Sequence, residues 1–335
     1  MPMDEFSLIK QYFSRQSFSR QDFSKQDVAT GLENQKTSGV VLGIGDDCAL
    51  LRPRQGEELA VSTDTLIEGV HFPAHSSAED IAQRALRVNV SDIAAMGAEP
   101  RWFQLALTLP QANADWLSSF SEGLFSAAEQ YGCTLVGGDT TRGPLAITIT
   151  VLGSLPAGRG LIRGGGRAGD KVFVTGKLGL GAAGLESIQQ GLSTKNDELW
   201  QAFWRPQARL REGQCLRGVA SAAIDISDGL HADLGHIATA SGVGAVLYSD
   251  QFPLSSTVIS VSGEQQARDW ALCGGDDYEL CFTVSPEKLA QLDALQKADA
   301  IHATEIGELV PGVGVKCLDK AGNTVILPQA GYSHF

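Results

Sequence analysis

Apolar runs of strand length alternate along the chain with longer stretches whose apolar positions recur at helical spacing. In the first half, this pattern predicts strands at Leu59 to Thr65, Trp102 to Leu109, Cys133 to Val136 and Leu145 to Leu152. Between them it predicts helices at Ser77 to Gly97 and Ala114 to Tyr131. Ser77 is a suitable N-cap for the first of these helices, and Gly97 is a suitable end.

The second half repeats the alternation after a glycine-rich segment at residues 154–170, which predicts a linker. Strands are expected at Lys171 to Thr175, Ala222 to Ile226, Gly244 to Tyr248 and Glu279 to Val284. Helices are expected at Ala182 to Gln190, Arg209 to Ala220, Leu230 to Ala240 and Pro286 to Gln296. Since 335 residues favour two domains over one, we predict a mixed α/β fold (α/β with α+β character) with domains at residues 39–153 and 171–335.

Residues 1–38 contain a short tandem repeat, Phe-Ser-Arg/Lys-Gln, which begins at Phe13, Phe18 and Phe23. The spacing of five suits neither one face of a helix nor one face of a strand. We therefore predict a mobile insertion without a catalytic role, and a docking segment is the alternative.

Aspartates recur where the apolar, glycine-rich segments end, and such loop ends are where folds expose functional groups. These acids are Asp47, Asp64, Asp139, Asp225, Asp228 and Asp276. Gathered carboxylates repel one another unless a cation lies among them, and Mg²⁺ is the usual cation beside nucleotide phosphates. Asp92 lies inside a predicted helix and shares a face with Val88, Asn89, Ala95 and Met96. Because a buried carboxylate is costly unless it is paired, Asp92 is interpreted as a metal ligand.

Three residues near these acids have two interpretations each. Asp228 either caps the following helix or binds metal, whereas Asp225 ends a strand and has no helix to cap. Ser227 either caps the same helix or contacts a phosphate. His71 follows the Asp64 loop and is either structural or a contact of the substrate.

Two arginines are candidates for phosphate contact. Arg142 and Arg163 are each flanked by glycines that let a ligand approach closely. Taken singly, each is more often a surface arginine.

The stretch from Gly179 to Gly184 fits the dinucleotide-binding pattern G-x-G-x-x-G, follows a predicted strand and opens a helix. The rest of that fingerprint is missing, because Asp197 and Glu198 lie in a polar helical stretch and not at the end of a second strand. Close helix packing is therefore favoured over dinucleotide binding. The chain also has no P-loop, no H-E-x-x-H and no G-x-S-x-G motif.

Composition excludes several classes of function. A net charge of −13 argues against a general nucleic-acid binder, since phosphate backbones are held mainly by Lys and Arg. No apolar stretch is long enough to span a membrane, and the first ten residues lack a secretory signal, so a cytoplasmic protein is expected. The six cysteines form no C-x-x-C pair and are expected to be reduced thiols.

Several stretches taken together resemble the thiamine-monophosphate kinase family, within the aminoimidazole-ribonucleotide (AIR) synthetase-like superfamily. They are Phe6 to Ile9, Gly43 to Ala49, Ser62 to Leu66, Asn89 to Ala98, Gly137 to Gly143, Ile224 to Leu230, Gly274 to Leu280 and Gly331 to Phe335. The resemblance implies an AIR-synthetase-like fold, with an N-terminal domain that binds ATP and metal and a C-terminal α/β domain. It also implies a homodimer that uses ATP and several Mg²⁺ ions to phosphorylate thiamine monophosphate to thiamine diphosphate, the last step of thiamine diphosphate biosynthesis.

The resemblance also implies roles for individual residues. Metal positions match Asp47, Ser62, Thr63, Asp64, Asp92, Asp139, Asp225 and Asp228. Nucleotide contacts match Gly138, Asp139, Arg163 and Ser227, and substrate contacts match His71, Asp276 and, more loosely, Tyr332. The family usually reads Gly-Gly-Glu-Asp-Tyr-Glu-Leu, so Asp276 replaces a glutamate here and is one methylene shorter.

No catalytic nucleophile or general base is expected, because a phosphate monoester oxygen is already ionised near neutral pH and can attack directly in line. The alternatives are another ATP-dependent enzyme of the superfamily, such as a selenophosphate synthetase, or a non-catalytic module that binds divalent ions. The reactive cysteine that a selenophosphate synthetase requires in a glycine-rich N-terminal segment is not found.

Overall fold

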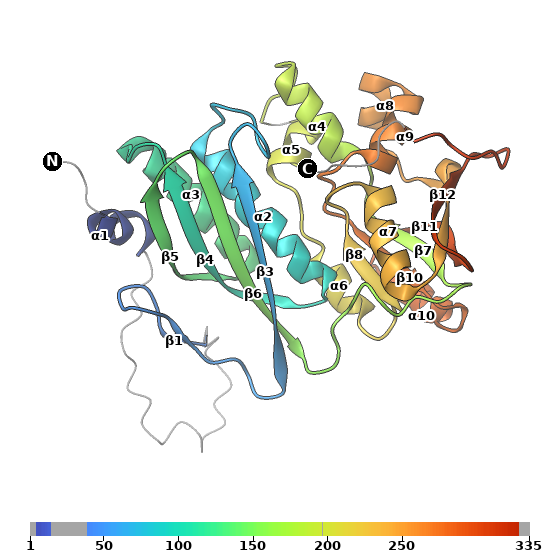
Figure 1. Cartoon of the computed structure of the whole chain (residues 1–335), viewed down its shortest axis with the longest axis horizontal. Coiled ribbons are helices and arrows are strands. Elements are labelled where there is room, and N and C mark those ends of the chain that lie inside the picture. The colour runs from blue at the N-terminus through green and yellow to red at the C-terminus, as the bar shows by residue number, and fades with distance from the viewer. Residues whose placement is uncertain (1–4, 15–38, 196, 328–335) are drawn as a thin grey trace. The chain divides into compact units, whose positions relative to one another are not determined.

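The computed structural model describes residues 5–14, 39–195 and 197–327, and it has the mixed α/β architecture that the sequence predicts (Figure 1). The chain forms two compact units. The first unit consists of the described residues up to Asn89 together with Pro100–Ala157, and the second of Val90–Glu99 together with the described residues from Gly158 onward. Among the described residues, no helix is both long and apolar enough to cross a membrane.

The first unit is built on a four-stranded sheet in the order β3-β6-β4-β5. Its strands are β3 (Glu57–Ile67), β4 (Glu99–Leu109), β5 (Thr134–Arg142) and β6 (Ala146–Pro156). Alternate residues of β6, including Ile147, Ile149 and Val151, are fully buried, as expected of a sheet with one covered face. Helix α3 (Ala114–Tyr131) lies behind this sheet in Figure 1 and buries Leu117, Phe120 and Leu124.

Short elements complete the first unit. Strands β1 (Val40–Leu42) and β2 (Leu50–Leu51) pair with each other, and α1 (Glu5–Leu8) continues into a π-helix at Ile9–Phe13. Phe13 is buried and its ring meets Phe120 edge-on, with centroids 6.4 Å apart. The prediction of a mobile repeat is therefore wrong for Phe13, because its ring packs into the core; residues 15–38 lie outside the described part of the chain.

Helix α2 (Ala78–Ala95) contributes residues to both units. It begins at the predicted N-cap, where the Asp80 N–H donates to Ser77 Oγ (3.2 Å) and Ser77 Oγ donates to the Asp80 carboxylate (2.5 Å). After the last turn, Gly97 adopts a φ of 66°, and a Cβ there would lie 2.9 Å from the Gly213 carbonyl oxygen. Glycine is therefore required where the helix ends.

The second unit is built on a six-stranded sheet in the order β12-β9-β11-β7-β10-β8. Its strands are β7 (Lys171–Thr175), β8 (Ala222–Asp225), β9 (Gly244–Tyr248), β10 (Leu280–Val284), β11 (Ala303–Val310) and β12 (Gly314–Leu318). Its helices are α4 (Leu180–Gln189), α5 (Glu198–Trp204), α6 (Leu210–Leu216), α7 (Leu230–Ser241), α8 (Ser256–Ser262), α9 (Glu264–Cys273) and α10 (Leu289–Lys297), with 3₁₀ turns at Ser249–Gln251 and Pro286–Lys288.

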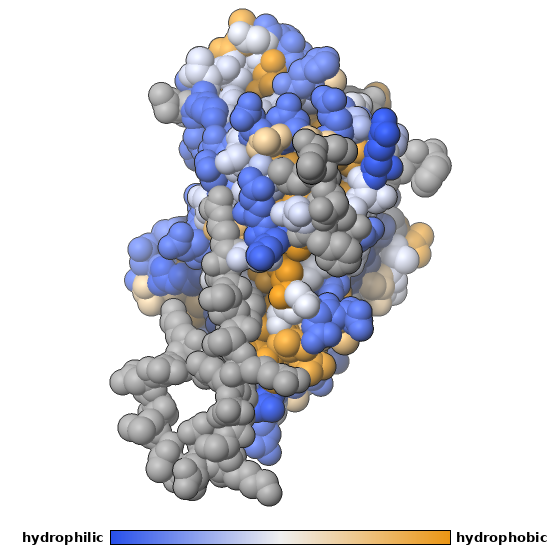
Figure 2. All heavy atoms as spheres, turned by 90° about the vertical axis from the view of Figure 1, so that its left-hand side faces the viewer, coloured by the Kyte–Doolittle hydropathy of each residue, from blue (hydrophilic) through white to orange (hydrophobic). Residues whose placement is uncertain are grey.

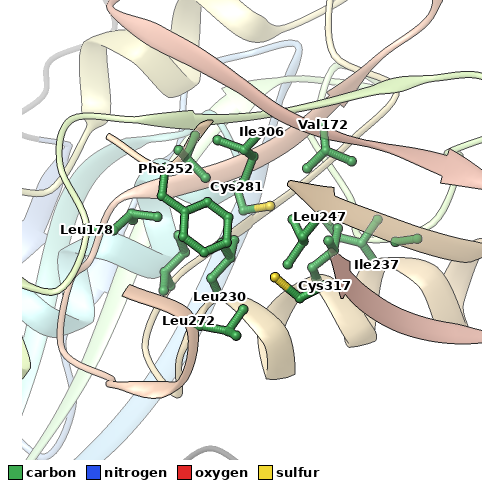
Figure 3. Close-up of a cluster of buried hydrophobic side chains, with 14 of the residues drawn as sticks. Val172, Leu178, Leu230, Ile237, Leu247, Phe252, Leu272, Cys281, Ile306 and Cys317 are labelled. Atoms are coloured by element: carbon green, nitrogen blue, oxygen red, sulfur yellow. The ribbon is translucent and has the colours of Figure 1, made fainter. Parts of the chain in front are cut away.

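The central strands of this sheet are buried on both faces, which explains why they read as continuous apolar runs. Val172 and Cys281 belong to the core cluster of Figure 3, together with Leu230 and Ile237 of α7 and Leu272 of α9. A second core cluster contains Phe173 of β7 and Leu280 and Phe282 of β10. These strand residues belong to it together with Leu216 of α6 and Leu292 of α10. Edge strand β8 ends at Asp225, and the candidate site of this unit begins there.

Candidate functional site

Asp225 ends β8 in a buried position and accepts a hydrogen bond from a serine that the sequence analysis did not select. Ser91 Oγ, itself fully buried, donates to Asp225 Oδ2 at 2.7 Å. Ser91 lies in the part of α2 that belongs to the second unit, directly before Asp92. Asp92 is half-buried, as are Ser227 and Asp228 in the loop after β8.

The loop after β8 is held by a carboxylate from within helix α7. Asp233 Oδ2 accepts hydrogen bonds from the backbone N–H groups of Ser227 and Asp228, at 3.0 Å each. The N-cap of α7 is Gly229 (φ 113°), so the interpretation of Asp228 as the cap is wrong. Burial raises the pKa of Asp233 to about 7, and the backbone donors lower it.

A second segment, Gly274 to Tyr278, runs beside that loop. The N–H of Asp276 donates to the Ser227 carbonyl (2.9 Å), and the N–H of Tyr278 donates to the Ile226 carbonyl (2.8 Å). A Cβ at Gly275 would lie 2.3 Å from the Ser227 carbonyl oxygen, so only glycine permits this approach. Two predicted residues with different roles, Ser227 for the nucleotide and Asp276 for the substrate, are thereby brought side by side.

Asp276 has an unusual backbone conformation for a non-glycine residue. Its φ is 68°, and that of Tyr278 is 52°, both in the left-handed region. Tyr278 Oη donates to Asp276 Oδ1 at 3.0 Å, which fixes the direction of the carboxylate. Such strain is typical of functional segments that the surrounding structure holds in place.

The G-x-G-x-x-G stretch is occupied by a carboxylate of the protein itself. Asp277 accepts hydrogen bonds from the N–H groups of Gly179 (2.8 Å) and Gly181 (3.1 Å) at the start of α4. A Cβ at Gly181 would lie 2.2 Å from the Asp276 carbonyl oxygen, and one at Gly184 would lie 2.3 Å from that of Leu199. These glycines serve close packing, as predicted, and the amides that would hold a pyrophosphate are already hydrogen-bonded.

Burial raises the pKa of Asp277 to about 8, and the amides of Gly179 and Gly181 oppose this effect. The following acid, Glu279, is ion-paired. Its carboxylate accepts from Arg209 Nε (2.6 Å) and Nη2 (2.5 Å) and from Thr175 Oγ1 (2.6 Å). The acids on both sides of Tyr278 therefore fasten this segment to α4, β7 and the start of α6.

The first unit presents its candidate residues on β3 and β5 and on the loop after β1. Asp47, Thr63, Asp64, Gly138 and Asp139 are exposed, and Ser62 is half-buried. The Asp64 N–H donates to Asn89 Oδ1 (3.1 Å), and Thr63 Oγ1 lies 2.9 Å from Thr150 Oγ1 on β6. Because side chains alternate along a strand, Ser62 and Asp64 share a face and Thr63 points to the opposite one.

Gly138 and His71 have specific local geometries. Gly138 has a φ of 150°, and a Cβ there would lie 1.8 Å from the Leu105 carbonyl oxygen. Only glycine therefore fits at this position of β5. His71 Nδ1 accepts the Ile67 N–H (3.0 Å), which leaves the proton on Nε2 and makes this atom a donor. Arg142 and Arg163 are exposed, and Tyr332 lies outside the described residues.

The predicted metal ligands are divided between the two units. Asp47, Ser62, Thr63, Asp64 and Asp139 belong to the first unit, and Asp92, Asp225 and Asp228 belong to the second. Within the described parts of the chain, no three His, Cys, Asp or Glu side chains are close enough together to hold a metal ion. The donors are hydroxyl and carboxylate oxygens, which are the ligands that Mg²⁺ prefers.

One serine and two aspartates that hold these loops in place were not identified from the sequence. Ser91, Asp233 and Asp277 have no distinctive spacing, and only their hydrogen bonds to Asp225, to the loop after β8 and to the start of α4 identify them. Local signals exist for Ser91, which directly precedes Asp92, and for Asp277, which directly follows Asp276 in the Gly274 to Leu280 stretch.

Comparisons with known proteins match both halves of the chain. The AIR synthase related protein N-terminal domain matches residues 45–155, and the AIR synthase related protein C-terminal domain matches residues 167–320. The thiamine-monophosphate kinase of Salmonella typhimurium is 44% identical over 100% of this chain and 99% of the relative.

Two solved structures are similar to most of the chain. The crystal structure of the thiamine-monophosphate kinase from Stenotrophomonas maltophilia has a TM-score of 0.80 at 44% identity and covers 87% of this chain and 93% of that one. The structure of AaThiL complexed with AMPPCP and TMP has a TM-score of 0.74 at 35% identity and covers 87% of this chain and 92% of that one.

Proposed function

The chain belongs to the thiamine-monophosphate kinase family of AIR synthase related proteins, and on this premise we propose that it transfers the γ-phosphoryl group of ATP to thiamine monophosphate. The products are ADP and thiamine diphosphate. The relative that was solved with AMPPCP, an ATP analogue, and TMP supports both substrates.

The observation that carries this proposal is the pair of hydrogen bonds between the loop after β8 and the Gly274 to Tyr278 segment. They place Ser227, assigned to ATP, beside Asp276, assigned to the acceptor. A phosphoryl transfer needs its two substrates held in line at one place, and these adjacent segments supply that proximity. Because Asp276 is shorter than the usual glutamate, a bridging water is expected between its carboxylate and the substrate.

Several Mg²⁺ ions are assigned to the site as cofactors. In the first unit, Asp47, Asp64 and Asp139 would hold Mg²⁺ together with oxygens of Ser62 and Thr63, and in the second unit Asp92, Asp225 and Asp228 would hold Mg²⁺. Bound Mg²⁺ supplies charge neutralisation between the phosphates of ATP and the acceptor. Gly138, Asp139 and Arg163 are assigned to ATP, and His71 offers the substrate its Nε2–H as a donor.

The transfer requires no covalent enzyme intermediate. An ionised phosphate oxygen of thiamine monophosphate attacks the γ-phosphorus of ATP, and the bond to the β,γ-bridging oxygen breaks as ADP leaves. The attacking oxygen carries no proton near neutral pH, so no general base is needed. Arg163 and the backbone N–H groups of the site then act by orientation and by charge stabilisation.

We further propose that the protein is a cytoplasmic homodimer. On β3, Leu59, Val61 and Ile67 share one face of the sheet and are 43%, 60% and 39% exposed. On the face shown in Figure 2, hydrophobic residues form surface patches between hydrophilic ones. A strand face with apolar residues at alternate positions supports burial against a second copy.

The proposed reaction is tested by incubating the protein with ATP, thiamine monophosphate and Mg²⁺ and separating the products by liquid chromatography. Thiamine diphosphate and ADP should accumulate in equal amounts. The non-catalytic alternative predicts binding of Mg²⁺ and nucleotide without product, and no thiamine diphosphate above a no-enzyme control would decide in its favour.

A further inference from the structure

Asp233 has a position and a set of hydrogen bonds that a surface helix residue does not have. It lies in the first turn of α7 and is 2% exposed. One of its oxygens, Oδ2, accepts the N–H groups of both Ser227 and Asp228, at 3.0 Å each. Two successive backbone donors therefore converge on one buried side chain.

This arrangement replaces an ordinary N-cap. The residue at the N-cap of α7 is Gly229, which has no side chain to accept the free N–H groups at the start of the helix. Asp233 accepts N–H groups from the segment that precedes the helix, so the course of the backbone from Asp225 to Gly229 depends on it. The other side of that segment is fixed by the Ser227 carbonyl, which accepts the Asp276 N–H at 2.9 Å.

The backbone of the segment from Asp225 to Gly229 determines the direction of three candidate side chains. Asp225, Ser227 and Asp228 are assigned to metal and nucleotide, and Asp233 accepts from the N–H groups of the last two. We propose that Asp233 is a positioning residue: it touches neither substrate, but it fixes the segment from Asp225 to Gly229 in the conformation that binds the nucleotide with its metal ions. The inference rests on the proposed function for the identity of the nucleotide.

Because two donors share one oxygen of Asp233, two variants can separate the role of the acceptor oxygen from that of the charge. Asp233→Asn keeps an acceptor oxygen that can take the place of Oδ2 while the charge is lost. Asp233→Leu has a similar volume and no acceptor. Loss of hydrogen bonds from buried donors weakens an interaction by roughly 10- to 100-fold.

The matched control is Asp319→Leu. Asp319 Oδ1 also accepts two backbone N–H groups, from Ala321 (2.9 Å) and Asn323 (2.8 Å). It lies in an exposed turn after β12, and β12 and β8 are the opposite edge strands of the six-stranded sheet. This variant also loses hydrogen bonds from backbone N–H groups to a carboxylate. The loss occurs at the opposite edge of the sheet from β8 and its candidate residues.

The test measures binding of AMPPCP with Mg²⁺ by titration calorimetry, together with the KM values for ATP and thiamine monophosphate. We expect Asp233→Leu to weaken AMPPCP binding about 10-fold or more and to raise the KM for ATP more than that for thiamine monophosphate. Asp233→Asn should restore binding to within about 3-fold of the wild type. Asp319→Leu should bind AMPPCP as the wild type does.

Two results would overturn the proposal. One is unchanged AMPPCP binding by folded Asp233→Leu, and the other is equal weakening in Asp233→Asn and Asp233→Leu. If the leucine variant does not fold, Asp233→Ser replaces it, because the shorter hydroxyl does not reach both donors. Since AMPPCP binding is measured without turnover, a wild type that binds AMPPCP but forms no thiamine diphosphate would refute the proposed reaction and leave this test valid.

Discussion

At the scale of single residues, Ser91 makes a buried hydrogen bond to a candidate metal ligand. Ser91 is fully buried, and its hydroxyl donates to the Asp225 carboxylate at 2.7 Å. A hydrogen bond to a charged group contributes more than one between neutral groups. Ser91 therefore orients a candidate metal ligand from a helix that also carries Asp92.

Replacing Ser91 by alanine should affect stability and activity together. Ser91→Ala removes one donor from a carboxylate that is only 5% exposed, which should lower the free energy of unfolding by about 2 kcal/mol. It should also reduce kcat, because Asp225 gains freedom to turn. Urea unfolding and steady-state kinetics measure the two effects.

Ser121→Ala is the matched control for this substitution. Ser121 is also fully buried in a helix, but its hydroxyl donates to the Ser118 carbonyl of the preceding turn (3.0 Å). The control should change stability slightly and leave kcat unaltered. Wild-type kcat in Ser91→Ala would show that Asp225 does not depend on this bond.

The aspartates differ in how far sequence alone identifies them. Asp225 and Asp276 stand at the ends of apolar or glycine-rich runs, so their position in loops was predictable from the pattern. Asp233 and Asp277 were not selected, because each role depends on backbone N–H groups that no sequence spacing reveals. The interpretation of Asp228 as a helix cap was wrong for the same reason. The carboxylate that accepts the backbone N–H groups is that of Asp233, in the first turn of α7.

At the scale of elements, the strongest apolar runs gave reliable predictions. Strands β7 and β9 and helix α3 coincide with the expected ranges. Strands β11 and β12 were not predicted, because β11 contains two glutamates and an irregular register at Glu305 to Gly307. Helices α8 and α9 were also missed, since Val258 is the one residue that α8 buries and α9 begins with the polar residues Glu264, Gln265 and Gln266.

Helix α4 and its capping carboxylate give a pH-dependent prediction. The pKa of Asp277 rises from 3.8 to about 8 in the folded protein, mainly through burial. Between these values the folded state holds a proton that the unfolded state has lost, so this contribution to stability decreases as the pH rises toward 8. In Asp277→Asn the contribution is absent.

The free energy of unfolding, measured by urea titration at several pH values, should therefore change with pH more steeply in the wild type than in Asp277→Asn. Relative to the variant, the wild type should lose stability as the pH rises from about 4 to about 8 and then level off. Asp115→Asn, at an exposed acid in the first turn of α3, is the control and should follow the wild type. Parallel curves for wild type and Asp277→Asn would show that the pKa of Asp277 is not raised in the folded protein.

At the scale of the whole molecule, the α/β class and the family were predictable, and the division of the chain was less so. Residues Val90–Glu99 belong to the second unit although they lie within the first predicted domain. Helical periodicity shows where α2 begins and ends, but it contains no information about which residues of the helix pack into which core. That assignment depends on packing between residues that are distant in sequence, such as the core cluster that contains Ala95, Leu216 and Phe282.

The proposed homodimer gives a prediction about the β3 face. Val61 is 60% exposed, and Val61→Asp would place a charge in an interface that the dimer buries. Light scattering after gel filtration should report a dimer for the wild type and a shift toward monomer for Val61→Asp. Glu58→Asp, at an exposed acid on the opposite face of the same strand, should remain dimeric; dimers of equal stability in all three proteins would exclude this face.

The proposed reaction transfers the γ-phosphoryl group of ATP to thiamine monophosphate. It is tested most directly with ATP that carries ¹⁸O in its γ-phosphoryl group, followed by mass spectrometry of the thiamine diphosphate formed. The label should appear in the terminal phosphate of thiamine diphosphate, with unlabelled ADP as the second product. Labelled inorganic phosphate without labelled thiamine diphosphate would contradict it.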